Sequence, residues 1–218
     1  MNLKTENFNK IFQEAIKNYH LRDSVNQDFK TPYENQNDFD AILYKKCWID
    51  SVQWHLEDLV RDPDIQPDEA IRYKRRIDSL NQQRTDLVEL IDDYIYQNFK
   101  NIKIAQNARL NTETPGWAID RLSILNLKIY HWKQETERED ATEQERLNAK
   151  NKLAILLQQQ KDLSSAIDQL IDELKNGKVI AKTYKQLKMY NDPKLNPVLR
   201  KSAKANQMFK GYFNDNTK

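Results

Sequence analysis

Residues 114–132, TPGWAIDRLSILNLKIYHW, decide the fold. Thr114 and Pro115 are a typical helix start, because threonine caps free N–H groups and proline fits the first turn. From Trp117 to Trp132 the sequence is apolar on most sides, whereas a surface helix carries a single apolar stripe. We therefore expect a central helix here that the rest of the chain covers.

The remaining sequence predicts four more long helices, from apolar stripes at 3.6-residue spacing and from cap and stop residues. The first ends near Leu21, the second runs from a cap at Asn37 or Asp38 to about Arg61, the third from Pro67 to about Phe99, and the fifth from a capping box at Asp140 and Glu143 to Gly177. A short sixth helix is expected at residues 179–190. The predicted fold class is all-α: a single-domain, largely antiparallel bundle of five long helices plus a short C-terminal helix, over residues 1–190.

The composition argues against several other classes. The chain has 218 residues, 39% of them hydrophobic, which is enough for one sizeable core. Three glycines supply almost none of the left-handed positions that tight hairpins and phosphate-binding loops need, which argues against all-β, Rossmann and P-loop folds. A single cysteine, Cys47, fits a reducing compartment. Without an apolar run near the roughly 20 residues of a membrane span, and without a signal-peptide core, we expect a cytoplasmic protein with no transmembrane segment.

Charge is divided unevenly along the chain. Residues 175–218 contain eleven Lys or Arg against two acids, so they carry +9 and residues 1–174 carry −7 of the net +2. Residues 191–218 are predicted to form a basic tail. One interpretation is attraction to nucleic acid or a membrane surface. We favour a solvated tail, or one docked on an acidic body, because the lysines are spread out, and nucleic acid is therefore an unfavoured partner.

Several helices are predicted to direct a charged or polar side chain inward. On the second helix His55 falls on the apolar face, beside a ridge that contains Trp54. On the third helix Arg84 interrupts the apolar stripe. The central helix carries three ionisable residues, Asp120, Lys128 and His131. A buried guanidinium needs a carboxylate, and the candidate partners of Arg84 are Asp50, Glu57, Asp58 and Asp120.

Two interpretations of these residues stay open. In the first they line a polar pocket, with His55, Glu57 or Asp58 as the catalytic acid or base and with Arg84, Asp120, Lys128 and Trp54 as binding residues. In the second they form a closed network that fixes the register of the helices and holds no ligand. The second interpretation is favoured by about three to two.

Recognised catalytic and metal motifs are mostly missing from the sequence. There is no His-Glu-x-x-His or Cys-x-x-Cys, and no Glu-x-x-His pair of the di-iron bundles. Asp86, Glu89 and Asp93 share one helix face and could hold Mg²⁺, but such acids are usually solvated. The sequence therefore predicts no metal site and no cofactor.

Several segments resemble a bacterial family of unknown function, DUF4254, found mainly in Bacteroidota. They are WIDSVQWHLEDLVRDP (48–63), RRIDSLNQQRTDLVELID (75–92), TETPGWAIDRLSILNLKIYH (112–131) and YKQLKMYNDPKLNPVL (184–199). Members of the family tend to be encoded near glycosyltransferases. The resemblance thus implies a cell-envelope glycan context and supplies no catalytic residues.

These observations lead to three functional hypotheses. They do not determine the oligomeric state. The first is a cytoplasmic binding or accessory protein in envelope polysaccharide or lipopolysaccharide synthesis, with an anionic sugar or nucleotide as ligand and a glycosyltransferase as partner. The second is an enzyme that acts on a phosphorylated or glycosyl substrate. The third is nucleic-acid binding through the basic tail.

Overall fold

The structure, a computed structural model, describes residues 3–180, 182–187, 192 and 194–202. The chain divides into two compact units, Met1–Thr183 and Tyr184–Lys218. The first unit contains five helices: α1 (Thr5–Tyr19), α2 (Phe39–Val60), α3 (Pro67–Phe99), α4 (Pro115–Glu137) and α5 (Glu143–Lys175). Apart from one isolated bridge, Arg109 to Val179, the described residues contain no β-structure. The predicted all-α fold is confirmed.

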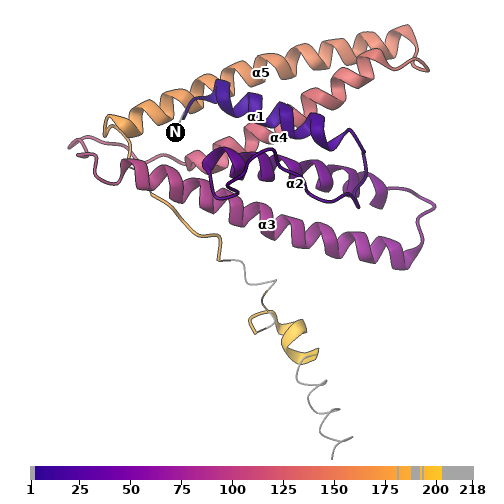
Figure 1. Ribbon diagram of the computed structural model, residues 1–218, viewed down its shortest axis with the longest axis horizontal. Helices are drawn as coiled ribbons and strands as arrows, with labels where there is room; N and C mark the ends of the chain where they lie inside the picture. Colours follow the sequence, from indigo (N-terminus) through magenta and orange to yellow (C-terminus); the bar gives the residue numbers. More distant parts are fainter. Residues whose placement is uncertain (1–2, 181, 188–191, 193, 203–218) are drawn as a thin grey trace, which may run out of the picture. The chain divides into compact units, whose positions relative to one another are not determined.

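The central position predicted for α4 is also confirmed. This helix packs against each of the other four, and its most extensive contact is with α5. Figure 1 shows α4 and α5 as one antiparallel pair and α2 and α3 as another, and α1 packs against α2, α4 and α5. Apolar and polar side chains alike are buried on α4, the polar ones being Asp120, Ser123 and Asn126. These buried polar residues are out of reach of water, so they must find partners inside the protein.

The start of α4 is fixed by its cap and by a close approach to α3. The Thr114 hydroxyl oxygen accepts from the Trp117 N–H at 3.3 Å, as predicted for a cap at this residue. The Asp92 carboxylate of α3 accepts from the Gly116 N–H at 2.6 Å. A Cβ at Gly116 would lie 2.6 Å from the Val88 carbonyl oxygen, so only glycine lets the two helices come this close.

Two predicted details in the second half of the chain are wrong. The capping box of α5 is formed by Thr142 and Glu145 and not by Asp140 and Glu143, because the hydroxyl of Thr142 reaches the N–H three residues on. Residues 182–187 are not helical, and the short C-terminal helix lies at 197–202 instead. Gly177 does end α5, with a left-handed φ of 67°.

Parts of two predictions cannot be compared with the structure. Residues 181 and 188–190 of the expected sixth helix lie outside the described residues. The same holds for residues 191, 193 and 203–218 of the expected basic tail. In the described part of the chain, no helix is both long enough and apolar enough to cross a bilayer.

Candidate functional site

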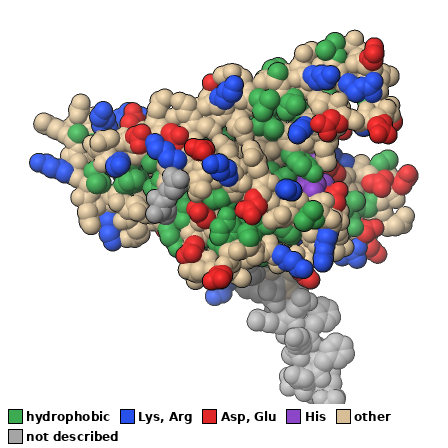
Figure 2. All heavy atoms as spheres, turned by 45° about the horizontal axis from the view of Figure 1, so that its top comes forward, with side chains coloured by type: hydrophobic (Ala, Val, Ile, Leu, Met, Phe, Trp, Pro, Cys, Tyr) green, Lys and Arg blue, Asp and Glu red, His purple; other side chains and the backbone are tan. Residues whose placement is uncertain are grey.

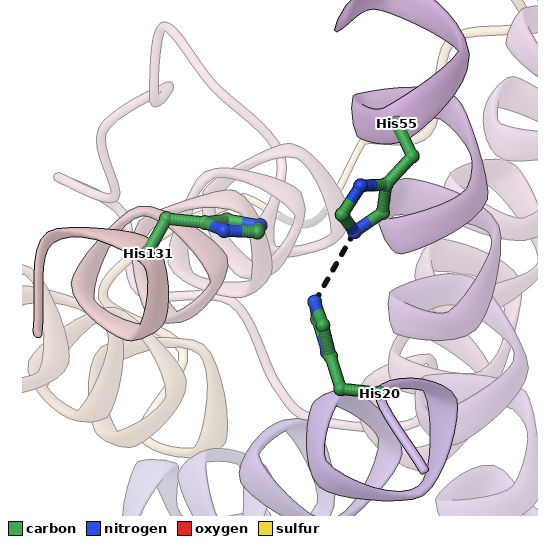
Figure 3. A group of neighbouring side chains, drawn as sticks. All are labelled: His20, His55 and His131. Atoms are coloured by element: carbon green, nitrogen blue, oxygen red, sulfur yellow. Dashed lines mark hydrogen bonds between the residues drawn. The ribbon is translucent and has the colours of Figure 1, made fainter. Parts of the chain in front are cut away.

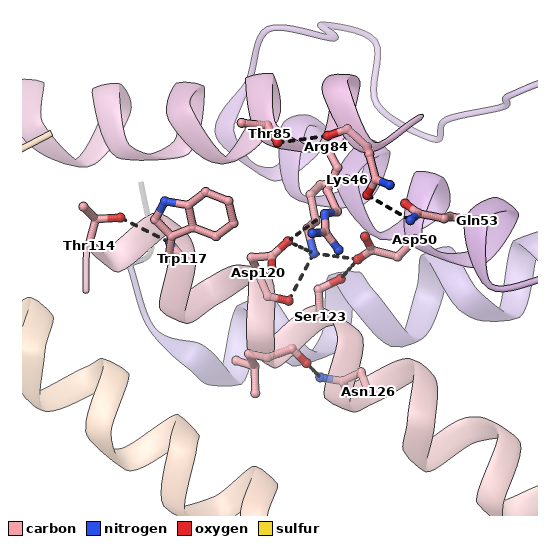
Figure 4. Close-up of polar contacts among 12 residues, drawn as sticks. Lys46, Asp50, Gln53, Arg84, Thr85, Thr114, Trp117, Asp120, Ser123 and Asn126 are labelled. Carbon is pink, nitrogen blue, oxygen red and sulfur yellow. Dashed lines mark hydrogen bonds and ion pairs between the residues drawn. The ribbon is translucent and has the colours of Figure 1, made fainter. Parts of the chain in front are cut away.

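A completely buried lysine, Lys46 of α2, organises the polar interior. Its Nζ lies 2.6 Å from Asp50 Oδ2 and 2.7 Å from Asp120 Oδ1, and it donates a hydrogen bond of 3.1 Å to the Asp120 carbonyl (Figure 4). An ammonium group has three protons to donate, and these three oxygens can take all of them. Lys46 thereby joins α2 to the central helix α4.

Two further side chains complete this buried network. Arg84 of α3 places its Nε 3.7 Å from Asp120 Oδ1. Asp120 is one of the four partners predicted for Arg84. The Ser123 hydroxyl donates to Asp50 Oδ2 at 2.7 Å. Two cations thus face two carboxylates. Burial raises the pKa of Asp50, while the charge of Lys46 opposes that rise.

An open pocket of about 280 Å³ lies beside this network, between α2, α3 and α4. It is lined by Asp50, Gln53, Trp54, Glu57, Asp58, Arg61, Arg84, Ile124 and Leu127. Three of these residues have a buried polar atom with no hydrogen-bond partner among the residues that the structure describes: Asp50 Oδ1, Gln53 Oε1 and Arg84 Nε. Two acceptors without a hydrogen-bond partner, and one donor that has only a 3.7 Å ion pair with Asp120, therefore belong to residues that line a single pocket.

A second cluster brings together all three histidines of the chain. His20 follows α1, His55 lies on α2 and His131 on α4, and their imidazoles point toward one another (Figure 3). One ring nitrogen from each lies within 4.8 Å of those of the other two. The Nε2 atoms of His20 and His55 are 3.2 Å apart. Residues at positions 20, 55 and 131 thus form one site.

Aromatic rings and burial hold these histidines in place and keep two of them uncharged. Tyr19 stacks on His55 with ring centroids 5.3 Å apart, and Trp54 stacks on His131 at 4.7 Å. Burial lowers the pKa of His20, and burial with the neighbouring histidines lowers that of His131 to about 4. Both imidazoles are therefore neutral at pH 7, which is the form that binds metal ions.

The structure divides the predicted site residues among three places. Trp54, Glu57, Asp58 and Arg84 line the pocket, and Asp120 lies next to it through its contact with Arg84. His55 belongs to the histidine cluster. Lys128 is exposed and lines a separate cavity of about 920 Å³ along α4 and α5. The seven residues named for the predicted pocket therefore do not all converge on one place.

Sequence reasoning missed Lys46 and His20. Lys46 follows another lysine, Lys45, and such a pair usually lies in solvent. Its spacing of four from Asp50 was the available signal, since residues four apart lie on one helix face. His20 lies at the end of a helix, and its distance in sequence from His131 gives no sign of their contact.

Comparison with known proteins gives one match. The family model described as "Protein of unknown function (DUF4254)" matches residues 40–183. That range contains the whole buried network and two of the three histidines, while His20 precedes it. No curated protein and no solved structure matches the chain. Because the match covers more than half of the chain, the protein belongs to the DUF4254 family.

Proposed function

We propose that the protein binds a glycosyl ligand, a sugar phosphate or nucleotide sugar, in the pocket between α2, α3 and α4. The observation that carries this proposal is the polar lining of the pocket: Asp50 Oδ1 and Gln53 Oε1 have no hydrogen-bond partner among the described residues, and Arg84 Nε has only its 3.7 Å ion pair with Asp120. A buried polar atom without a partner costs about 1–3 kcal/mol, so a ligand toward which Asp50 and Gln53 turn these oxygens recovers part of that free energy.

Sugar hydroxyls match this combination of donors and acceptors. A hydroxyl donates one hydrogen bond and accepts others, so neighbouring hydroxyls can pair with carboxylate, amide and guanidinium groups together. Trp54 adds an aromatic wall to the pocket, against which the apolar C–H face of a sugar ring can pack. The pocket therefore offers both kinds of contact that a pyranose needs.

Size and charge indicate how much of the ligand the pocket holds. Its volume of about 280 Å³ is just below the range of about 300–1,000 Å³ for small-molecule sites, so it fits a single sugar unit. The charges of Lys46 and Arg84 balance those of Asp50 and Asp120. A phosphate or nucleotide would therefore remain near the rim, where Arg61 lines the pocket.

The geometry favours binding over catalysis. The three catalytic candidates are separated: His55 lies in the histidine cluster, Glu57 pairs with Arg61 at 2.8 Å, and Asp58 is exposed. The glycan context implied by the family resemblance supports the same ligand class. We propose a binding or accessory role in cytoplasmic steps of envelope polysaccharide synthesis, with a glycosyltransferase as partner.

The test is calorimetric titration of the full chain with a panel of sugar phosphates and nucleotide sugars. Arg84→Gln removes one pocket cation, while Arg72→Gln removes an exposed cation from the same helix and serves as the matched control. We expect at least one ligand to bind the wild type and the control alike. The Arg84 variant should bind it at least about tenfold more weakly, a difference of roughly 1.4 kcal/mol. An empty panel, or equal affinity in all three proteins, contradicts the proposal.

A further inference from the structure

We propose that His20, His55 and His131 bind a divalent transition-metal ion, with Asp23 as the fourth ligand. The pocket proposed for the glycosyl ligand is a different place, although Trp54 contributes to both. Imidazole nitrogens suit Zn²⁺, Cu²⁺, Fe²⁺ and Ni²⁺, and three histidines with one carboxylate give a complete four-ligand set.

The spacing of the nitrogens fits such an ion. Two histidine nitrogens at about 2.0–2.1 Å from a tetrahedral Zn²⁺ lie roughly 3.3 Å from each other. The Nε2 atoms of His20 and His55 are 3.2 Å apart. The largest separation among the three nitrogens is within 4.8 Å, which exceeds the tetrahedral value by roughly 1.5 Å. Since His20 and His55 are already at the tetrahedral separation, binding would require the His131 ring to move toward them.

The ring of His20 is already oriented as a metal ligand. Its Nδ1 lies 2.7 Å from the carbonyl oxygen of Ile16, and because a carbonyl only accepts, Nδ1 must carry the proton. The lone pair of His20 is therefore on Nε2, the atom that faces His55. A second ring nitrogen that donates to a backbone carbonyl is the usual support of a metal-binding histidine.

His131 has an unused ligand atom in the same place. Its Nε2 is buried and has no hydrogen-bond partner within the described part of the chain. A purely aromatic cluster would gain nothing from this unpaired nitrogen, since a phenyl ring packs equally well without the cost of burying a polar atom. A metal ion would give the nitrogen its partner.

Asp23 supplies a negative charge beside the two other histidines. Its Oδ1 lies 3.4 Å from His55 Nε2 and 3.9 Å from His20 Nε2. Asp23 has a left-handed φ of 48°, a conformation that aspartate tolerates better than most residues. The Asp23 side chain is 57% exposed, and Figure 2 shows histidine at the molecular surface, so an ion can enter from solvent.

The test uses the untagged full chain, stripped of metal with a chelator and titrated with Zn²⁺ and Co²⁺. We expect one equivalent to bind per chain, with the visible absorption of a four-coordinate Co²⁺ site. His55→Phe and His131→Phe keep a ring against Tyr19 and Trp54 but remove one ligand each. They should weaken binding by more than the about 10- to 100-fold that loss of an outer-shell partner costs. Tyr130→Phe, which keeps its ring 4.2 Å from His20, is the matched control and should bind like the wild type.

A second measurement does not depend on the variants folding. X-ray absorption at the zinc edge of the wild-type protein counts the imidazoles around the ion, and we expect three. Absence of binding to the wild type, unchanged affinity in the histidine variants, or fewer than three imidazoles at the zinc would each overturn the proposal.

Discussion

Replacing the buried Lys46 with methionine tests whether the interior is an ion-paired network. Methionine has a similar length, so the change removes a charge and leaves little cavity. Asp50 would keep only its Ser123 hydrogen bond, and Asp120 would keep Arg84 at 3.7 Å. Removing one partner of a buried ion pair costs about 3–5 kcal/mol. For a chain of this size we expect the melting temperature to fall by about 6–20 °C.

The cost of this substitution should depend on pH. Burial raises the pKa of Asp50 in the folded protein above that of the unfolded chain, about 3.9. Folded protein therefore holds this proton more tightly, and the associated stability is lost as pH rises through the folded pKa. Lys46 is the main influence that lowers this pKa, so its removal raises the pKa further. The variant should therefore lose more stability relative to wild type at pH 8 than at pH 5.

Urea denaturation at both pH values measures these differences, and a double variant isolates the coupling. Lys46→Met combined with Asp120→Asn leaves Arg84 and Asp50 as a balanced pair of charges. The double variant should be more stable than the sum of the single changes predicts, by about 2 kcal/mol. A cost below about 1 kcal/mol for Lys46→Met, independent of pH and additive with Asp120→Asn, would refute the ion-paired network.

Three further substitutions test two contacts between helices and one helix cap by the same denaturation assay. Gly116→Ala should cost about 1–3 kcal/mol, because its Cβ would meet the Val88 carbonyl at 2.6 Å; a neutral result would show that α3 and α4 can separate freely. Thr142→Ala should cost about 1 kcal/mol through loss of the α5 capping box, whereas no cost would mean that the cap is dispensable. Asp168→Ala removes the acceptor of the Thr5 N–H and hydroxyl, at 2.9 and 3.0 Å, and should cost about 1–3 kcal/mol; an unchanged midpoint would argue against this link between α1 and α5.

The helices could be predicted from sequence because their signals are local. The apolar character of residues 117–132 and the cap at Thr114 are properties of neighbouring positions, and the structure has both where they were expected. The prediction of a sixth helix was wrong at residues 182–187. Most of those side chains are exposed, so a helix there would have no packed face to stabilise it.

The sites could be predicted only in part because they depend on contacts between distant segments. Helical phase indicated that Arg84 points inward, and Asp120 was one of its candidate partners. The same reasoning identified His55 and His131 as inward residues but not their contact with each other, and it missed His20, which comes from a third element. Lys128 lies on a helix that is buried on most sides, yet its own side faces solvent. A single sequence indicates the apolar and polar faces of each helix, but it does not indicate which faces of different helices pack together.

The most direct test of the proposed function follows the four tryptophan indole N–H signals in a two-dimensional NMR spectrum. Trp54 is the one tryptophan among the residues that line the proposed glycosyl pocket, and Trp54→Phe would assign its signal. On addition of a glycosyl ligand that binds by calorimetry, we predict that the Trp54 signal shifts and that the signals of Trp48, Trp117 and Trp132 stay in place. A shift of other indoles with the Trp54 signal unmoved would place the ligand elsewhere and contradict the account.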